Sequence, residues 1–182
     1  MAKYVQSGQV SFREAEVFTL DEFGGLLPGD SGLCVQQLRH SLIDHIDLPP
    51  EQFHFLHTEA ENLDAECLRY DEAIGHGFDL TLLGVGLNGH LGMNEPGTPA
   101  DRTTHTVVLH PTTVEASRRY LTHTQAPTWG VTVGLKQLLE SWASRANFRE
   151  FDVHQGYTES FAFLAVACGA RYYKNLPCKA RA

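Results

Sequence analysis

The sequence predicts an α/β domain in which a parallel sheet carries helices on both faces. Two observations lead to this expectation. Short runs of apolar and β-branched residues alternate with segments whose apolar residues recur at helical spacing, which is the rhythm of βαβ units. The run at residues 78–85 is almost continuously apolar, as a central strand of a parallel sheet tends to be.

The expected strands are short, and each is followed by a turn or a helical segment. They cover residues 16–20, 53–56, 78–85 and 106–109. Residues 129–133 precede a further helix, and residues 161–166 form an additional strand candidate near the C-terminus.

The expected helices have recognisable start and stop signals. Ser31 is expected to cap a helix whose apolar face includes Leu38, Leu42 and Ile46, and Pro49-Pro50 ends it. Leu63, Cys67, Tyr70 and Ile74 predict a second helix, for which Gly75 is a suitable end. Pro111 can open a third helix.

Composition limits the functional classes. The 182 residues are expected to form a single α/β domain, residues 1–182, and 42% hydrophobic content is typical of a globular protein. A formal net charge of −8 argues against general nucleic-acid binding, although a local basic pocket can still hold an anionic substrate. No apolar run approaches the length of a membrane span, and the N-terminus lacks an apolar signal core, so a cytoplasmic protein is expected.

Cysteine and histidine patterns do not predict a metal site. The four cysteines form no Cys-x-x-Cys pair, and the ten histidines lack His-Glu-x-x-His or His-x-His spacing. Reduced thiols and no metal are therefore the expectation.

The strongest functional signal is the glycine-rich turn at residues 83–97. It follows an apolar run and contains Asn88, His90 and Glu95. Asp21 and Glu22 follow a second apolar run, and ligands bind beyond the carboxyl ends of parallel strands. If these strands are parallel neighbours, the two clusters share one crevice, where a carboxylate and an imidazole can move protons.

Each residue has a simpler interpretation when taken alone. An aspartate after a strand is commonly a turn or helix cap, and glycine-rich turns often serve geometry only. His90 can equally be a structural histidine. The combination of the two clusters is what favours a site over these alternatives.

The turn Gly84-Val-Gly-Leu-Asn-Gly-His-Leu-Gly-Met-Asn-Glu-Pro-Gly97 closely resembles that of the glucosamine-6-phosphate deaminase family, including galactosamine-6-phosphate deaminase/isomerases. Leu20-Asp-Glu-Phe23, Asp64-Ala-Glu-Cys67 and Val131-Thr-Val-Gly134 resemble further family segments in the same order. The resemblance covers about residues 17–141. The resemblance implies a Rossmann-like sheet. The sister 6-phosphogluconolactonases are a less similar family, because their turn has a different tail without Asn-Glu-Pro.

The resemblance also implies a chemistry. Family members open the ring of a 2-amino-sugar 6-phosphate, move a proton between C2 and C1, and release ammonia to leave a ketose phosphate, without a cofactor. Asp21 would be the base, and His90 would assist ring opening. Glu95 and Asn88 would orient and tune His90.

Substrate-binding roles follow from the same resemblance. Arg118 would contact the phosphate, and Gly89 would line the substrate site. Many relatives have Asp where this chain has Asn88, and the lost charge is expected to lower the pKa of His90. The simpler interpretation of Arg118 is a solvated helix charge beside Arg119.

Two departures from the family pattern leave alternatives open. Asp21 comes early in the chain, and Ser7-Gly8 lacks the preceding strand of the family's phosphate loop, so the sheet is expected to be incomplete relative to the family. Residues 142–182 form a divergent tail. A sugar-phosphate lactonase and a non-catalytic fragment therefore remain alternatives to a deaminase, and a homo-oligomer is left open.

Overall fold

The computed structural model describes residues 2–119, 121, 125–141 and 164–168, and for the last range the backbone alone. The described helices are α1 (Ala2–Gln6), α2 (Cys34–Ser41), η1 (Ile43–His45), η2 (Pro50–Gln52), α3 (Leu63–Ile74), α4 (Pro111–Ser117) and α5 (Leu135–Glu140). The described strands are β1 (Ala15–Thr19), β2 (Asp21–Phe23), β3 (Phe53–His54), β4 (Leu80–Leu82), β5 (His105–Val108), β6 (Trp129–Thr132) and β7 (Leu164–Cys168).

The strands form two mixed sheets. The larger has the order β3-β1-β7-β4, with a parallel β1–β3 pair and antiparallel β1–β7 and β4–β7 pairs. The smaller has the order β2-β6-β5, and both of its pairs are antiparallel. Only Leu20 separates β1 from β2, so the chain passes directly from one sheet to the other.

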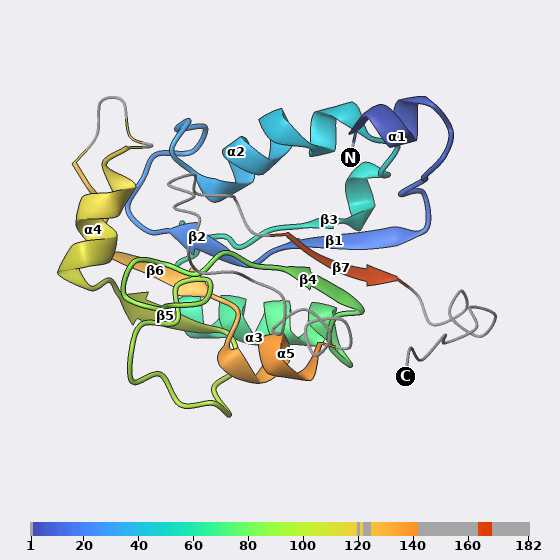
Figure 1. The fold of residues 1–182 in the computed structure, drawn as a ribbon. Helices are drawn as coiled ribbons and strands as arrows, with labels where there is room; N and C mark the ends of the chain where they lie inside the picture. The colour runs from blue at the N-terminus through green and yellow to red at the C-terminus, as the bar shows by residue number, and fades with distance from the viewer. Residues whose placement is uncertain (1, 120, 122–124, 142–163, 169–182) are drawn as a thin grey trace, which may run out of the picture.

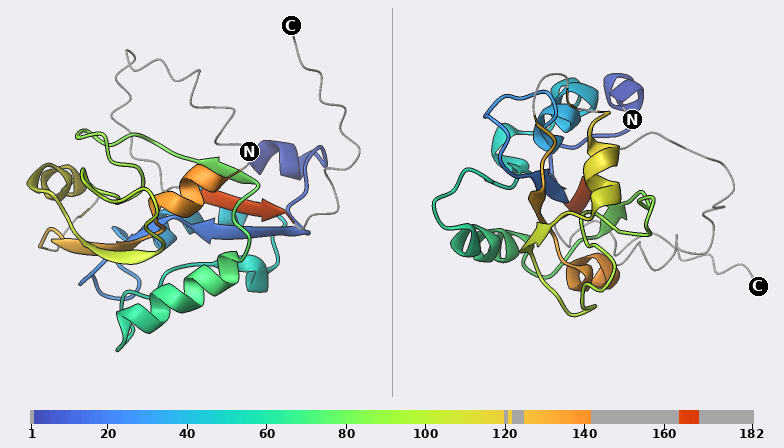
Figure 2. Two further views of the ribbon diagram at one scale, coloured as in Figure 1. Left: turned by 90° about the horizontal axis from the view of Figure 1, so that it is seen from below. Right: turned by 90° about the vertical axis from the view of Figure 1, so that its left-hand side faces the viewer.

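Helices cover both faces of the sheets, which confirms the predicted α/β class (Figures 1 and 2). Side chains of β1 alternate between two apolar clusters, as the period of a strand requires. Val17 packs in a cluster with Leu38 of α2, whereas Phe18 packs in another cluster with Tyr70 of α3 and Leu138 of α5.

The expected parallel sheet is mixed in the described residues, where β1–β3 is the parallel pair and the other pairs are antiparallel. The strands β1 and β4 are not neighbours, because β7 lies between them and runs antiparallel to both. The predicted central strand at residues 78–85 is reduced to β4, which pairs only with β7 among the described strands. Leu82 is exposed, so the apolar character of this run does not reflect burial on both faces.

The predicted helices at residues 63–74 and after Pro111 are confirmed. The predicted cap at Ser31 is wrong: α2 begins at Cys34, its N-cap residue is Leu33, and no side chain of the cap residue bonds to the helix. The Glu22 side chain, from β2, instead accepts the backbone N–H groups of Cys34 and Val35 in the first turn of α2.

Candidate functional site

Asp21 is the first residue of β2, where it is in register with Thr132 of β6. It is almost completely buried, and its Oδ2 has no hydrogen-bond partner among the described residues. The thiol of Cys34 donates to Oδ1 over 3.3 Å. Burial raises the pKa of Asp21 to about 6, and the bond from Cys34 partly opposes this increase. A carboxylate with this pKa and one free oxygen is suited to accept a proton near neutral pH.

The neighbouring Glu22 has a structural role. Its Oε1 accepts the N–H groups of Phe23 and Cys34, both at 2.8 Å, and its Oε2 accepts the N–H of Val35 at 2.9 Å. Two of these donors belong to the first turn of α2, whose N–H groups have no partner within the helix. Burial raises the pKa of Glu22 to about 7, against the opposing effect of the three donors. Glu22 therefore holds α2, and with it Cys34, against β2.

The glycine-rich turn is a compact loop tied to β6. The N–H of Met93 donates to Thr132 Oγ1 at 3.1 Å, and the Asn94 side-chain amide donates to the Val133 carbonyl at 2.8 Å. Gly92 has a φ of +61°, a conformation that favours glycine. The segment 131–134, which the sequence singled out, therefore fixes the position of the loop.

His90, Asn88 and Glu95 form one network within this loop. Asn88 Oδ1 lies 2.6 Å from His90 Nδ1, and Asn88 Nδ2 donates to Glu95 Oε2 at 2.7 Å. Glu95 Oε2 also lies 3.8 Å from His90 Nδ1. The Asn88 amide nitrogen donates to Glu95, so the Asn88 amide oxygen faces the His90 ring. This favours the neutral tautomer with its proton on Nδ1, which leaves Nε2 as an acceptor.

Burial favours the neutral form of this imidazole. Burial lowers the pKa of His90, and the charge of Glu95 opposes the decrease. Burial alone would raise the pKa of Glu95, but hydrogen bonds from Thr113, the His110 N–H and Asn88 outweigh it and lower the pKa. Glu95 is thus a stable anion beside a neutral histidine. Gly86 leaves room for the ring, because a Cβ there would lie 2.1 Å from a His90 carbon.

Gly92 is where the loop that carries the His90 network comes near Asp21. A Cβ built on Gly92 would lie 3.4 Å from Asp21 Oδ2 and 3.0 Å from Thr132 Oγ1. The loop that carries His90 therefore approaches the free oxygen of Asp21 at Gly92, although β1 and β4 are not neighbours. This approach depends on β2, β6 and the loop rather than on adjacent parallel strands, and a crevice shared by Asp21 and His90 stays a prediction.

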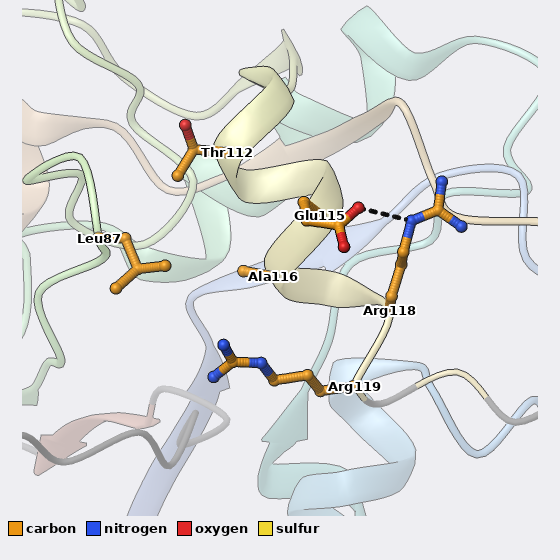
Figure 3. Close-up of a pocket in the computed structure, with 6 residues that line it drawn as sticks. All are labelled: Leu87, Thr112, Glu115, Ala116, Arg118 and Arg119. Atoms are coloured by element: carbon orange, nitrogen blue, oxygen red, sulfur yellow. Dashed lines mark hydrogen bonds and ion pairs between the residues drawn. The ribbon is translucent and has the colours of Figure 1, made fainter.

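Arg118 and Arg119 lie beside a surface depression of about 350 Å³ that is also lined by Leu87 of the glycine-rich loop (Figure 3). Figure 3 shows Arg119 extending past Ala116 toward Leu87, whereas Arg118 lies on the other side of α4. Arg118 Nε donates to Glu115 at 2.9 Å, and both side chains are exposed. Gly89 is exposed on the same loop, with a φ of +87°.

Sequence reasoning missed two residues of the site. Cys34 reaches Asp21 because Glu22 anchors α2, and the thirteen-residue separation in sequence carries no signal for this contact. Thr113 Oγ1 lies 3.3 Å from His90 Nδ1 and comes from α4, which the sequence predicted only as a helix. Thr132, by contrast, lies in the segment Val131-Thr-Val-Gly134, whose resemblance to the family had already marked it in the sequence.

Comparison with known proteins identifies the family. The family described as glucosamine-6-phosphate isomerases/6-phosphogluconolactonase matches residues 1–141. The chain belongs to this family. The glucosamine-6-phosphate deaminase of Bacillus pumilus is 42% identical over 139 residues, which are 75% of this chain and 58% of the relative. That of Shouchella clausii is 39% identical over 144 residues, covering 78% of this chain and 58% of the relative.

A solved structure extends the comparison to the fold. It is described as a monomeric glucosamine-6-phosphate deaminase and a missing link of the NagB superfamily. It is 33% identical, with a TM-score of 0.73 over 77% of this chain and 59% of that structure. The chain thus spans about three-fifths of the length of the relatives it matches.

Two further features of the described residues bear on function. They contain no helix long and apolar enough to cross a membrane. They also contain no group of three or more His, Cys, Asp or Glu side chains arranged to hold a metal ion.

Proposed function

We propose that this protein converts a 2-amino-2-deoxyhexose 6-phosphate, glucosamine 6-phosphate or its galactosamine epimer, and water into a ketose 6-phosphate and ammonia. The proposed reaction is an aldose-to-ketose isomerisation followed by hydrolysis of the resulting imine. One water is consumed and one ammonia is released, so that no redox cofactor is required.

The proposed roles follow the chemistry of each group. Asp21 takes the proton from C2 of the open-chain sugar through Oδ2 and returns it to C1. His90 uses Nε2 to relay the proton during ring opening. Asn88 and Glu95 orient the imidazole, and Glu95 stabilises the imidazolium that forms transiently. Arg118 and the backbone of Gly89 contribute to substrate binding, and this role requires the Arg118 guanidinium to leave Glu115 and turn to the phosphate.

One observation carries the proposal. The buried oxygen Asp21 Oδ2 has no partner among the described residues, and the backbone of Gly92 lies against it in the loop that holds the His90 network. An unpartnered buried carboxylate oxygen is costly to maintain in a folded protein. A proton-transfer role accounts for that cost, whereas a turn or helix cap would use the oxygen as an acceptor.

The test is ammonia release from glucosamine 6-phosphate by the full chain and by Asp21→Asn. The variant should lose turnover by roughly 10²–10⁴-fold, the usual contribution of a general base, while sugar-phosphate binding persists. Glu14→Gln, at an exposed position before β1, is the matched control and should behave like the parent. Normal turnover by Asp21→Asn would overturn the base assignment.

Two other outcomes would replace the proposal. Hydrolysis of 6-phosphogluconolactone without ammonia release would indicate the sister activity of the family. A folded chain that is silent in both assays would indicate a non-catalytic member. Galactosamine 6-phosphate in the same assay identifies the preferred epimer.

The proposal includes a cytoplasmic location, where phosphorylated sugars are retained by the charge that prevents their crossing a membrane. A homo-oligomer stays a prediction for this chain, and the solved relative is described as monomeric. Light scattering of the purified chain, with and without the sugar phosphate, measures the assembly state.

A further inference from the structure

We propose that Cys34 is a positioning residue for Asp21: its thiol fixes the carboxylate so that Oδ1 is engaged and Oδ2 faces the glycine-rich loop. The inference rests on the proposed role of Asp21 as the base. It adds to that function a residue from a different element, α2, that acts through Asp21 and does not itself touch the substrate.

The geometry supports this role from both sides of the contact. Cys34 Sγ lies 3.3 Å from Asp21 Oδ1, and both residues are buried. The same Cys34 donates its backbone N–H to Glu22 Oε1 at 2.8 Å. Glu22 therefore holds the backbone of Cys34, and Asp21 accepts the bond from its side chain. The backbone bond sets the position of the Cα atom of Cys34, and the thiol bond to Oδ1 is the side-chain contact that orients the carboxylate.

The thiol is suited to act as a permanent donor. Burial and the adjacent carboxylates of Glu22 and Asp21 raise the pKa of Cys34 well above its usual range, so the thiol keeps its proton at neutral pH. A bond donated to the ionised carboxylate favours that form. Cys34 thus limits the increase that burial imposes on the pKa of Asp21.

The other elements around Asp21 offer it no competing charge in the described part of the chain. Thr132 of β6 and the backbone of Gly92 are uncharged neighbours. The nearest imidazoles along these elements are His90, two residues from Gly92, and His105, in register with Thr132 on β5. Glu22 is the one acidic neighbour whose charge couples to Asp21, and its oxygens are occupied by backbone N–H groups.

Infrared spectroscopy tests the contact without requiring any activity. Subtracting the spectrum of Cys34→Ser from that of the parent isolates the S–H stretching band of Cys34 from those of the other three cysteines. We expect this band to shift as the pH crosses the pKa of Asp21 at about 6, and this shift to be absent from the same subtraction made on an Asp21→Asn background, where only the effect of Glu22 near pH 7 remains. A band that is identical in both backgrounds would overturn the proposal.

Kinetics test the consequence for the reaction. Activity that needs ionised Asp21 declines on the acidic side, and Cys34→Ala should move that decline to higher pH by roughly one unit, because a donor to the carboxylate is lost. Cys34→Ser keeps a donor and should restore the parent profile. If Cys34→Ala lowered activity by the same factor at every pH, Cys34 would contribute packing alone, and its proposed positioning role would be overturned. If no variant or parent releases ammonia, the proposed function fails while the infrared result still decides the contact.

Discussion

At the scale of the residue, the proposed role of Asp21 as the base would favour chemistry at the expense of stability. Its pKa is about 6 in the folded protein, against 3.8 for an ordinary aspartate. The folded state therefore binds the proton more tightly, and stability is lost as the pH rises from about 4 to about 6. Above that window the ionised carboxylate costs roughly 3 kcal/mol of folding free energy. Such a penalty is typical of residues retained for chemistry.

The variant Asp21→Asn should remove this penalty. We expect it to be more stable than the parent by up to about 3 kcal/mol above pH 6, and nearly equal to the parent below about pH 4. Urea unfolding across this pH range measures the difference. Asp101→Asn, at an exposed position, is the control and should follow the parent throughout. A parent and an Asp21→Asn variant with parallel pH profiles would show that Asp21 carries no such penalty.

At the scale of elements, the loop at residues 84–97 carries the imidazole network and comes near Asp21, the proposed base, at Gly92. Alanine at Gly92 would combine the strain of a φ of +61° with a Cβ that lies 3.4 Å from Asp21 Oδ2. Gly97, with a φ of +98° and open space around its Cβ position, provides the strain without the contact. Comparing Gly92→Ala with Gly97→Ala therefore separates the effect of backbone strain from the effect of covering Asp21 Oδ2.

Both alanine variants should lose about 1 kcal/mol or more of stability, because L-residues disfavour positive φ. Only Gly92→Ala should also lose turnover, by up to about a hundredfold, since the added methyl group covers the free oxygen and shifts Thr132. Thermal melts and ammonia release measure the two effects. Equal turnover in both variants would mean that Gly92 does not border the reacting groups.

The sequence predicted the elements better than their pairing. Periodicity located α3 and most strands, because spacing of apolar residues reflects burial within one element. The glycine-rich motif located the His90 network for a similar reason, since Asn88, His90 and Glu95 are close in sequence. The capping of α2 by Glu22 and the contact from Cys34 were not predictable, because they depend on how α2 packs against β2.

At the scale of the whole molecule, β7 is the strand that joins distant parts of the chain. It pairs with β1 on one side and β4 on the other, so among the described strands residues near positions 17 and 81 share one sheet only through residues 164–168. The apolar run before the glycine-rich loop could not reveal this, because sequence periodicity does not encode the partner of a strand. The stability of β4 therefore depends on a segment that lies outside the family match at residues 1–141.

Proline at Val166 tests this dependence. Val166 is in register with Val17 of β1 and Leu80 of β4, and proline would remove its N–H and disrupt pairing in the middle of the sheet. We expect amide hydrogen exchange at residues 80–82 to become fast in Val166→Pro and to stay slow in Val166→Ala, which keeps the N–H. Exchange in α3, which packs on the opposite cluster through Tyr70, should change less. Slow exchange of β4 in the proline variant would mean that β4 is held by contacts other than its pairing with β7.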